Sequence, residues 1–452
     1  MDAGARTQSV DTIAALATAF GSAGVGIVRV SGPLARSIGE SLAGQALKAR
    51  HALHAHLRDA DGEVLDDAVV LYFQGPHSYT GEDVLELRAH GNPSLLNAIL
   101  RECRRLGARD ARAGEFTERA FLNDKLDLAQ AEAVADLISA QSETAARAAR
   151  RSLDGVFSQR CDTLSEQLVH ARVYVEAALD FPDEEIDFLA APEIQNLLVR
   201  CRTDLAKLRA EAEQGKRLMD GLHVVIIGAP NAGKSSLLNA LAGEDRAIVT
   251  DIAGTTRDLL RETIQIDGLW LTLVDTAGLR DSKETVEAEG IRRARGELDK
   301  ADIILAVLDD SLHGAGELAE ELKGCTGRVL WLHNKSDLSG HAIERQPRED
   351  GMHLWLSAKN GGGLDVLKQE LSRAAGSGET GTGSFSARAR HLDALALAAE
   401  HLQRATQLCN QTQAELAAEE LRLAHHAIGS ITGHMDADAL LGRIFSSFCI
   451  GK

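Results

Sequence analysis

The segment Gly228–Ser235 constrains the fold of this chain more than any other part of the sequence. It reads Gly-Ala-Pro-Asn-Ala-Gly-Lys-Ser, follows the apolar run Leu222–Ile227 and precedes a helix-like run at 236–241. In a strand–loop–helix context, backbone N–H groups of such a loop surround phosphate oxygens. Lys234 is then placed to reach the β- and γ-phosphates, and the Ser235 hydroxyl to hold Mg²⁺. A chance glycine-rich turn is the alternative, and the eight-residue match in this context argues against it.

Three further motifs follow in order, each after an apolar run: Asp275-Thr-Ala-Gly278, Asn334-Lys-Ser-Asp337 and Ser357-Ala-Lys359. Asp275 is expected to hold Mg²⁺ through water, and Gly278 to offer an N–H to the γ-phosphate. Asp337 can accept both the ring N–H and the exocyclic NH₂ of guanine. Adenine would leave that carboxylate unpaired, which costs binding free energy. The four motifs together predict a GTPase.

One expected catalytic group is missing from this set. Ras-like enzymes orient the attacking water with a glutamine directly after the Asp-x-x-Gly motif, and here that position is Leu279. Charge on the transferring phosphoryl group still needs compensation. The substitute must come from another chain, another ion or a more distant side chain. Glu287, in the acidic stretch 284–289, is a candidate, and a solvated loop is the alternative for that stretch.

Composition limits the other possibilities. A chain of 452 residues should hold about three domains of ~150 residues. No apolar stretch approaches the ~20 residues that span a membrane, and the N-terminus does not resemble a signal peptide. The six cysteines are scattered without a Cys-x-x-Cys pair, which indicates reduced thiols in a cytoplasmic protein. The net charge of −18 argues against indiscriminate binding to nucleic acid or anionic lipid.

Hydrophobic patterns divide the chain into three parts. Residues 1–118 alternate short strand-like runs with turn residues, which predicts an α+β domain. Apolar residues recur at helical spacing over 119–215 and again over 385–452, and we expect these segments to share one discontinuous helical domain. Residues 217–375 form the predicted α/β Ras-like P-loop G domain, inserted into that helical domain. The Gly-, Ser- and Thr-rich stretch 376–384 is expected to be a linker.

The chain resembles the MnmE (TrmE) family of tRNA-modification GTPases over essentially its whole length. The resemblance is carried by motifs at 24–32, 78–83, 114–127, 254–258 and the terminal Cys449-Ile-Gly-Lys452. Ala19-Phe20 and Ala113 stand where the family often has prolines. The resemblance implies a homodimer that works with a FAD-dependent partner, the MnmG protein. Together they would place a (carboxymethyl)aminomethyl group on C5 of the wobble uridine of certain tRNAs.

The resemblance also implies a one-carbon cofactor, 5-formyl- or 5,10-methylene-tetrahydrofolate, with glycine or ammonium as the nitrogen source. The family's folate-contacting positions fall on Arg29, Glu86, Lys125 and Lys452. A carboxylate can read the donor edge of a pterin, and cations suit the glutamate tail. Cys449 is a candidate wall residue of the same site because Lys452 would favour its thiolate; an inert thiol is the alternative.

For the GTPase, the resemblance implies K⁺ in place of an arginine finger, held by Asn231 and by oxygens of Thr250, Ile252 and Thr255. Thr256 would join Ser235 on Mg²⁺, and hydrolysis would be coupled to dimerisation of G domains. The implied catalytic residues are Glu287, which matches the water-orienting position, Lys234 and Asn231. The full set expected to contact GTP is Asn231, Ala232, Gly233, Lys234, Ser235, Ser236, Thr250, Asp251, Ile252, Ala253, Gly254, Thr255, Thr256, Asp275, Thr276, Ala277, Gly278, Asn334, Lys335, Asp337, Ser357, Ala358 and Lys359.

Two questions stay open at this point. Arginine-rich segments at 101–112, 147–151 and 200–209 are candidates for tRNA contact, and solvated helix faces are the alternative. A ribosome-assembly GTPase would share the whole nucleotide-binding module. A folate-binding regulatory protein is a third, weaker interpretation. Only the N-terminal folate positions and the terminal tetrapeptide separate these functions.

Overall fold

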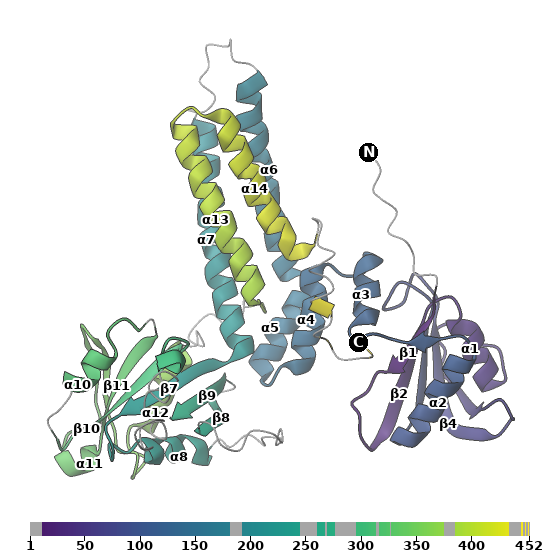
Figure 1. Ribbon diagram of the computed structural model, residues 1–452, viewed down its shortest axis with the longest axis horizontal. Helices are drawn as coiled ribbons and strands as arrows, with labels where there is room; N and C mark the ends of the chain where they lie inside the picture. The colour runs from purple at the N-terminus through teal and green to yellow at the C-terminus, as the bar shows by residue number, and fades with distance from the viewer. Residues whose placement is uncertain are drawn as a thin grey trace, which may run out of the picture. The chain divides into compact units, whose positions relative to one another are not determined.

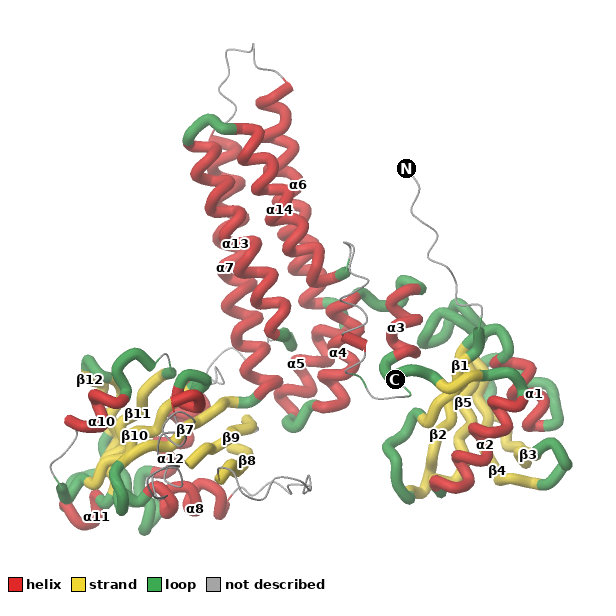
Figure 2. The backbone as a smooth tube through the Cα atoms, viewed as in Figure 1, coloured by secondary structure: helices red, strands yellow, loops and turns green. Residues whose placement is uncertain are grey.

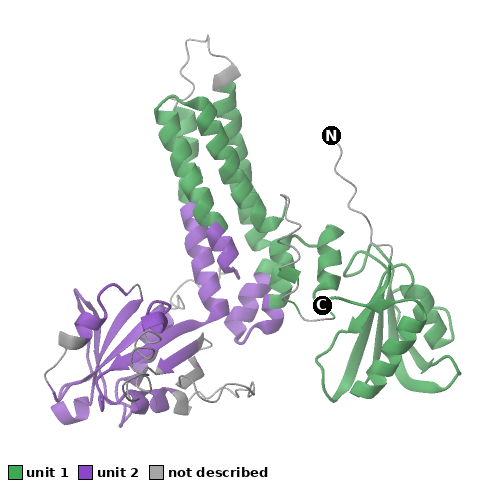
Figure 3. Ribbon diagram, viewed as in Figure 1, with its two compact units in different colours: residues 1–135, 152–204, 394–452 green, residues 136–151, 205–393 purple. Residues whose placement is uncertain are grey.

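The structure is a computed structural model that divides into two compact units, residues 1–135, 152–204 and 394–452 and residues 136–151 and 205–393 (Figure 3). The residues that the structure describes are 11–180, 192–244, 260–266, 269–275, 295–312, 316–325, 327–374, 385–433, 444–445, 448 and 451. The predicted three-domain boundaries stay a prediction, because the two units divide the helical segments at other positions.

A six-stranded sheet forms the N-terminal part of the first unit (Figure 1). All neighbouring strands are antiparallel except β1 and β6, which are parallel. This arrangement confirms the expected α+β fold. The strands are β1 (Ile13–Leu16), β2 (Ala23–Ser31), β3 (Leu53–Arg58), β4 (Val64–Phe73), β5 (Val84–Gly91) and β6 (Arg109–Asp110), in the order β3-β4-β5-β2-β1-β6.

Two helices cover this sheet and a third follows it. Ile38 of α1 (Ala35–Ala43) and Ile99 of α2 (Pro93–Arg105) join the buried strand residues in one core. Helix α2 begins at a defined cap, because the Asn92 side chain accepts hydrogen bonds from two backbone N–H groups and Pro93 occupies the first turn. Helix α3 (Glu115–Leu122) then leads into the helical segments.

The helical segments are long and their members pair closely (Figure 2). In the first unit, Gln195 Nε2 donates to Asn410 Oδ1 at 3.2 Å, and His401 Nδ1 lies 2.6 Å from Glu420 Oε2. Among the described residues, no helix combines the length and hydropathy that a membrane span needs. The helices are α4 (Leu128–Ser139), α5 (Glu143–Leu153), α6 (Val156–Asp180), α7 (Pro192–Asp220), α13 (Ala389–Asn410) and α14 (Ala414–Thr432).

The second unit contains a seven-stranded sheet in which the five central strands are parallel and the two edge strands antiparallel. Its central strands are nearly continuous apolar runs because helices cover both faces. The order is β12-β13-β11-β10-β7-β9-β8. The strands are β7 (Leu222–Gly228), β8 (Leu260–Ile266), β9 (Leu269–Asp275), β10 (Ile303–Asp309), β11 (Arg328–Asn334), β12 (Arg345–Arg348) and β13 (Gly351–Trp355).

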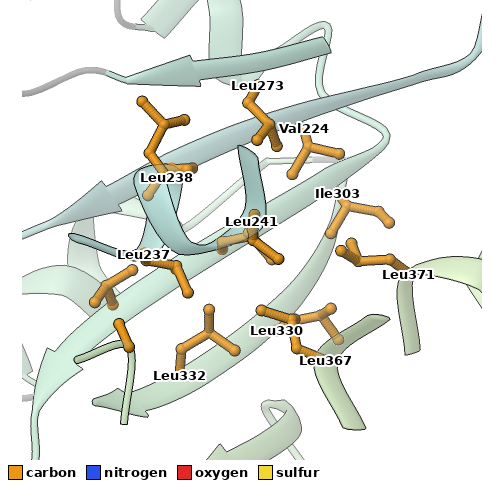
Figure 4. Packing of buried hydrophobic residues seen from close by; sticks show 14 of the residues in the cluster. Val224, Leu237, Leu238, Leu241, Leu273, Ile303, Leu330, Leu332, Leu367 and Leu371 are labelled. Atoms are coloured by element: carbon orange, nitrogen blue, oxygen red, sulfur yellow. The ribbon is translucent and has the colours of Figure 1, made fainter. Parts of the chain in front are cut away.

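The helices that accompany this sheet include α8 (Lys234–Glu244), α10 (Gly316–Glu321), α11 (Ser336–Ser339) and α12 (Leu364–Ala374). Figure 4 shows leucines of α8 and α12 packed on one face of the strands. A second buried cluster, which includes Val225, Ile304 and Trp331, covers the other face. Parallel strands end at one edge of the sheet, so the predicted motifs that follow β7, β11 and β13 gather at that edge.

The chain returns from the sheet through residues 385–388, here called the return segment. A Cβ on Gly215 of α7 would overlap the carbonyl oxygen of Phe385. Ser386 N donates to Ala148 O of α5 at 3.2 Å, and the Arg388 guanidinium donates to Asp136 Oδ1 at 2.6 Å. The return segment is therefore packed against α7 and bonded to α5 and the end of α4 within one compact unit.

Replacement of Gly215 by alanine should lower the free energy of unfolding by about 1–3 kcal/mol, because the added methyl group overlaps main-chain atoms that cannot rotate away. Gly296→Ala is the matched control: this second helical glycine has open space around its Cβ position, and alanine there should be neutral or stabilising. Equal denaturation midpoints for the two variants would contradict the packing described here.

Candidate functional site

The phosphate loop connects β7 to α8 and has the backbone that its glycines predict. Gly228 has φ 154° and Gly233 has φ 97°, and a Cβ on Gly228 would meet Val307 O of the neighbouring strand. Asn231, at the apex, has φ 64° and is exposed. The loop therefore ends at the N-terminus of α8, where unpaired N–H groups favour an anion.

Lys234 lies across this loop at the first position of α8. Its Nζ donates to Gly228 O at 2.8 Å and to Ala229 O at 2.9 Å, and the residue is only 6% exposed. A phosphate placed within the loop would compete for this ammonium group. Ser235 follows in the first turn with an exposed side chain, so its hydroxyl can meet a Mg²⁺ ion beside that phosphate.

Asn334 joins three of the predicted motifs through one buried amide. Its Nδ2 donates to Ala232 O of the phosphate loop at 2.9 Å, and its Oδ1 accepts from Ala358 N at 2.9 Å. The residue is 3% exposed. The structure thus brings the motifs at 228–235, 334–337 and 357–359 together, although they are far apart in the sequence.

The Asp337 carboxylate is held by the motif at 357–359. Ser357 Oγ donates to Asp337 Oδ1 at 2.6 Å, which orients the carboxylate that is predicted to read guanine. Lys335 adopts φ 66°, and its Nζ lies 2.6 Å from Asp309 Oδ2. Burial acts to raise the pKa of Asp309, but hydrogen bonds from Lys335 and Ser311 outweigh burial, so the pKa is lowered.

Asp309 was not among the predicted site residues. A usable signal was present, because Asp309 and Asp310 end the apolar run of β10 as Asp275 ends that of β9. Polar residues at the carboxyl ends of parallel strands commonly face the ligand site. Asp275 does end its strand as predicted, but its side chain lies outside the described residues.

Several predicted site residues lie outside the part of the chain that the structure describes, and their roles stay predictions. They are Thr250, Asp251, Ile252, Ala253, Gly254, Thr255, Thr256, Thr276, Ala277, Gly278, Glu287, Cys449 and Lys452.

The second predicted site falls on the N-terminal sheet, where Arg29 of β2 is the direct cross-strand partner of Glu86 of β5. Their side chains form an ion pair of 3.0 Å, and Arg88 approaches the other Glu86 oxygen at 2.9 Å. The Arg29 guanidinium carbon lies 5.5 Å from the ring centroid of Tyr79 and 5.8 Å from that of Phe116. Its Nε is buried without a hydrogen-bond partner among the described residues.

Electrostatics keep Glu86 ionised although the residue is 9% exposed. Burial acts to raise the pKa of Glu86, but the hydrogen bonds and charges of Arg88 and Arg29 outweigh it, and the pKa is lowered. The predicted Lys125 contacts a neighbouring loop, where its Nζ donates to Pro76 O at 3.1 Å. The candidate site thus holds a buried carboxylate and a guanidinium that lies over two aromatic rings, while the Lys125 ammonium group contacts the loop that contains Tyr79.

The C-terminal tail reaches the same sheet. Gly451 has φ 93°, and a Cβ there would overlap Leu16 O at the end of β1. Leu16 pairs with Val28, the residue before Arg29. Phe445 and Phe448 of the tail pack in a cluster with Phe121 and Leu128. Among the described tail residues, Gly451 therefore contacts the end of β1, the strand that pairs with the one carrying Arg29.

The arginine-rich segment 101–112 is extensively neutralised by acids. Arg104 pairs with Asp110 at 2.9 Å, and Arg105 with Glu102 at 2.7 Å. Further ion pairs join Arg109 to Asp11 and Glu115, and Arg112 to Glu118. Contact of this segment with tRNA stays a prediction, and the local excess of positive charge is smaller than the sequence indicated.

A phosphate loop ahead of a helix, joined through a buried asparagine to two base-side loops at the carboxyl edge of a parallel sheet, defines a P-loop GTPase. The model of the TrmE N-terminal family matches residues 12–125, and that of the MnmE helical domain matches residues 128–449. The chain belongs to the MnmE (TrmE) family of tRNA-modification GTPases. The predicted family, fold class and enzyme class are confirmed.

Named relatives cover the whole chain. A tRNA modification GTPase MnmE of Xanthomonas campestris is 56% identical over 447 residues, which span 98% of this chain and 99% of the relative. That of Pseudomonas aeruginosa is 53% identical over 452 residues, with the same coverage. Among solved structures, the G domain of the T. maritima FeoB iron transporter is 26% identical, with 34% of this chain and 98% of that chain covered and a TM-score of 0.26. The family assignment rests on the full-length relatives and the family models.

Gly233→Ala should weaken binding of GDP by about 1–3 kcal/mol, because the new Cβ would displace the Asn334 amide and leave its partners unpaired. Isothermal titration calorimetry measures the effect. The matched control is Gly324→Ala, since Gly324 has φ 86° but open space at its Cβ position. If both variants bind GDP equally, the close contact between the phosphate loop and Asn334 does not matter for affinity.

Proposed function

We propose that this protein is a K⁺-activated GTPase that, with a FAD-dependent MnmG partner, installs a (carboxymethyl)aminomethyl group on C5 of the wobble uridine of certain tRNAs. The one-carbon unit comes from 5-formyl- or 5,10-methylene-tetrahydrofolate, and GTP hydrolysis is coupled to dimerisation of G domains in a homodimer. The observation that carries the proposal is the partly buried Arg29–Glu86 pair, whose guanidinium lies over the rings of Tyr79 and Phe116. A GTPase that only switches a binding partner has no use for this site.

The geometry of the N-terminal site suits a pterin. An ionised carboxylate has roughly four lone-pair positions, and among the described residues two hydrogen bonds from arginines occupy those of Glu86. The ring N–H and amino group of a pterin can share the others. The Lys125 ammonium group, close to the same loop as Tyr79, suits the carboxylates of the folate tail. The approach of Gly451 to Leu16 supports a role for Lys452 beside this site.

The residues of the G domain support guanine and phosphate binding by the named motifs. Asp337, oriented by Ser357, would accept both donors of guanine. Lys234 and the start of α8 would hold the phosphates, with Ser235 and Thr256 on Mg²⁺. A K⁺ ion held by Asn231, Thr250, Ile252 and Thr255 would supply the positive charge that an arginine finger supplies elsewhere. Asn231 fits this role because its amide is exposed at the loop apex.

The cysteines support a reducing, cytoplasmic location. None of the five described cysteines forms a disulfide. Burial raises the pKa of Cys103 to about 12, and that of Cys201 and of Cys409 to about 11, so these thiols are chemically inert. Cys449 is the thiol that is proposed to lie in the substrate site, because it precedes the tail residue Gly451, which contacts β1.

GTP turnover should respond to K⁺ and not to Na⁺, because the smaller ion fits the same set of oxygens poorly. Asn231→Ala should remove the K⁺ response while GDP affinity changes little. Asn239→Ala, an exposed asparagine of α8 in the same domain, is the control and should keep the response. Phosphate release at matched ionic strength measures both variants, and equal rates in the two salts would refute K⁺ activation.

Glu86→Gln should weaken binding of 5-formyl-tetrahydrofolate by about 1.5–3 kcal/mol, because a charge-assisted acceptor is lost. Wobble-uridine modification should fall accordingly, while K⁺-stimulated hydrolysis of GTP stays unchanged. Mass spectrometry of nucleosides from cells that express only the variant measures the modification. Glu102→Gln removes another arginine-paired carboxylate of the same sheet domain and should leave folate binding intact.

A chain that lacks residues 449–452 separates this function from ribosome assembly. The proposal expects loss of the C5 modification and weaker folate binding with normal hydrolysis. A ribosome-assembly GTPase would give normal wobble nucleosides after the same truncation. Loss of hydrolysis as well would show that the tail is needed for folding or dimer assembly and that the two sites are not separable.

A further inference from the structure

Asp310 lies directly after β10 and is among the most enclosed carboxylates of the G domain, with a side chain that is 7% exposed. Its Oδ2 accepts from Ser339 Oγ and faces His341 Nδ1 at 2.5 Å. Its Oδ1 accepts from Trp355 Nε1 at 3.1 Å and faces His333 Nδ1 at 3.4 Å. Four side chains from three other segments therefore converge on one carboxylate.

These four side chains lie close in sequence to the two loops, 334–337 and 357–359, that are predicted to hold the base. His333 precedes Asn334, and Ser339 ends α11, the short helix that contains Asp337. Trp355 ends β13, two residues before Ser357. The backbone reinforces the arrangement, because Asp310 N donates to Asn334 O at 2.9 Å.

Aromatic stacking and a second ion pair stiffen the same corner. The His333 and Trp355 rings stack with centroids 4.3 Å apart and planes 6° from parallel. The adjacent Asp309 pairs with Lys335 at 2.6 Å. Both loops are thus bonded to the end of one central strand, and neither can shift without breaking contacts to Asp309 or Asp310.

The Asp310 carboxylate is ionised at neutral pH. Burial acts to raise its pKa, but hydrogen bonds from Ser339 and His341 and the nearby histidines outweigh burial and lower the pKa. An enclosed charge with several donors forms stronger hydrogen bonds than a neutral acceptor does. Its removal would leave the Trp355 N–H and its neighbours unpaired.

We propose that Asp310 is a positioning residue for guanine recognition. Its carboxylate fixes the loop 334–337 relative to the loop 357–359, so that Asp337 meets both donors of the base at once. Asp310 itself does not touch the nucleotide in this arrangement. The inference rests on the guanine pocket proposed above. Recognition by two simultaneous hydrogen bonds tolerates little displacement, so looser loops lose base discrimination before they lose phosphate binding.

The test measures the affinity of the full-length chain for GDP and for inosine diphosphate, which lacks the exocyclic amine of guanine. Asp310→Ala should weaken GDP binding about tenfold and inosine diphosphate binding much less, so the ratio of the two affinities shrinks. KM for GTP should rise with kcat nearly unchanged, because the lost interaction is equal in ground and transition states. Asp310→Asn keeps one acceptor oxygen and should give an intermediate ratio.

Glu370→Ala is the matched control for loss of stability. Glu370 is a buried carboxylate of α12 that pairs with Arg328, Arg345 and Arg373. Arg328 lies at the opposite end of β11 from Asn334, so this variant loses comparable ion pairs away from the base loops. Thermal unfolding of both variants measures the general destabilisation, and only the Asp310 variant should change the affinity ratio.

The outcomes separate the possible failures. An unchanged ratio for Asp310→Ala, or an equal decrease for Glu370→Ala, overturns the positioning role. If Asp310→Ala does not fold, the affinity ratio of Asp310→Asn is used instead, and an unchanged ratio overturns the positioning role. Asp337→Asn serves as the check on the pocket itself: if this variant keeps the wild-type ratio, the proposed guanine contact is wrong, whatever the Asp310 variants do.

Discussion

The buried amide of Asn334 is the contact on which the nucleotide site depends. Its two ends are satisfied by main-chain groups of two different loops, Ala232 O and Ala358 N. A buried amide cannot lose one of these partners without a cost of about 1–3 kcal/mol, so each loop holds the other in place. The phosphate loop and the loop at 357–359 are consequently joined through one side chain. The glycine at 233 is required because the amide occupies the space of a side chain.

Contacts to main-chain atoms and a partly buried ion pair also attach the return segment to its helices. The return segment has Gly215 against its main chain, a backbone hydrogen bond to Ala148 and the Arg388–Asp136 ion pair. These three contacts come from α7, α5 and α4. The second compact unit therefore includes not only the G domain but also α5 and the C-terminal half of α7.

Local motifs could be predicted from the sequence, whereas their long-range partners could not. The phosphate loop and the base motifs are short and follow apolar runs, so their chemistry and their strand ends were predictable. Asp309 and Asp310 act through residues of other strands, and no local pattern shows which strands are neighbours. The register that sets Arg29 opposite Glu86 spans 57 residues and is fixed only by the sheet. For the arginines at 101–112 the sequence left tRNA contact and a solvated face open, and it could not show that Arg109 pairs with Asp11, 98 residues away.

Two buried carboxylates of this protein differ in a way that indicates their roles. A carboxylate offers roughly four lone-pair positions. Asp310 has a side chain directed at each position, from Ser339, His341, Trp355 and His333, and has no capacity left for a ligand. Glu86 receives hydrogen bonds only from Arg29 and Arg88 among the described residues, although it is enclosed enough to need more. The saturated carboxylate therefore serves the architecture of a site, and the unsaturated one is available to bind what enters it.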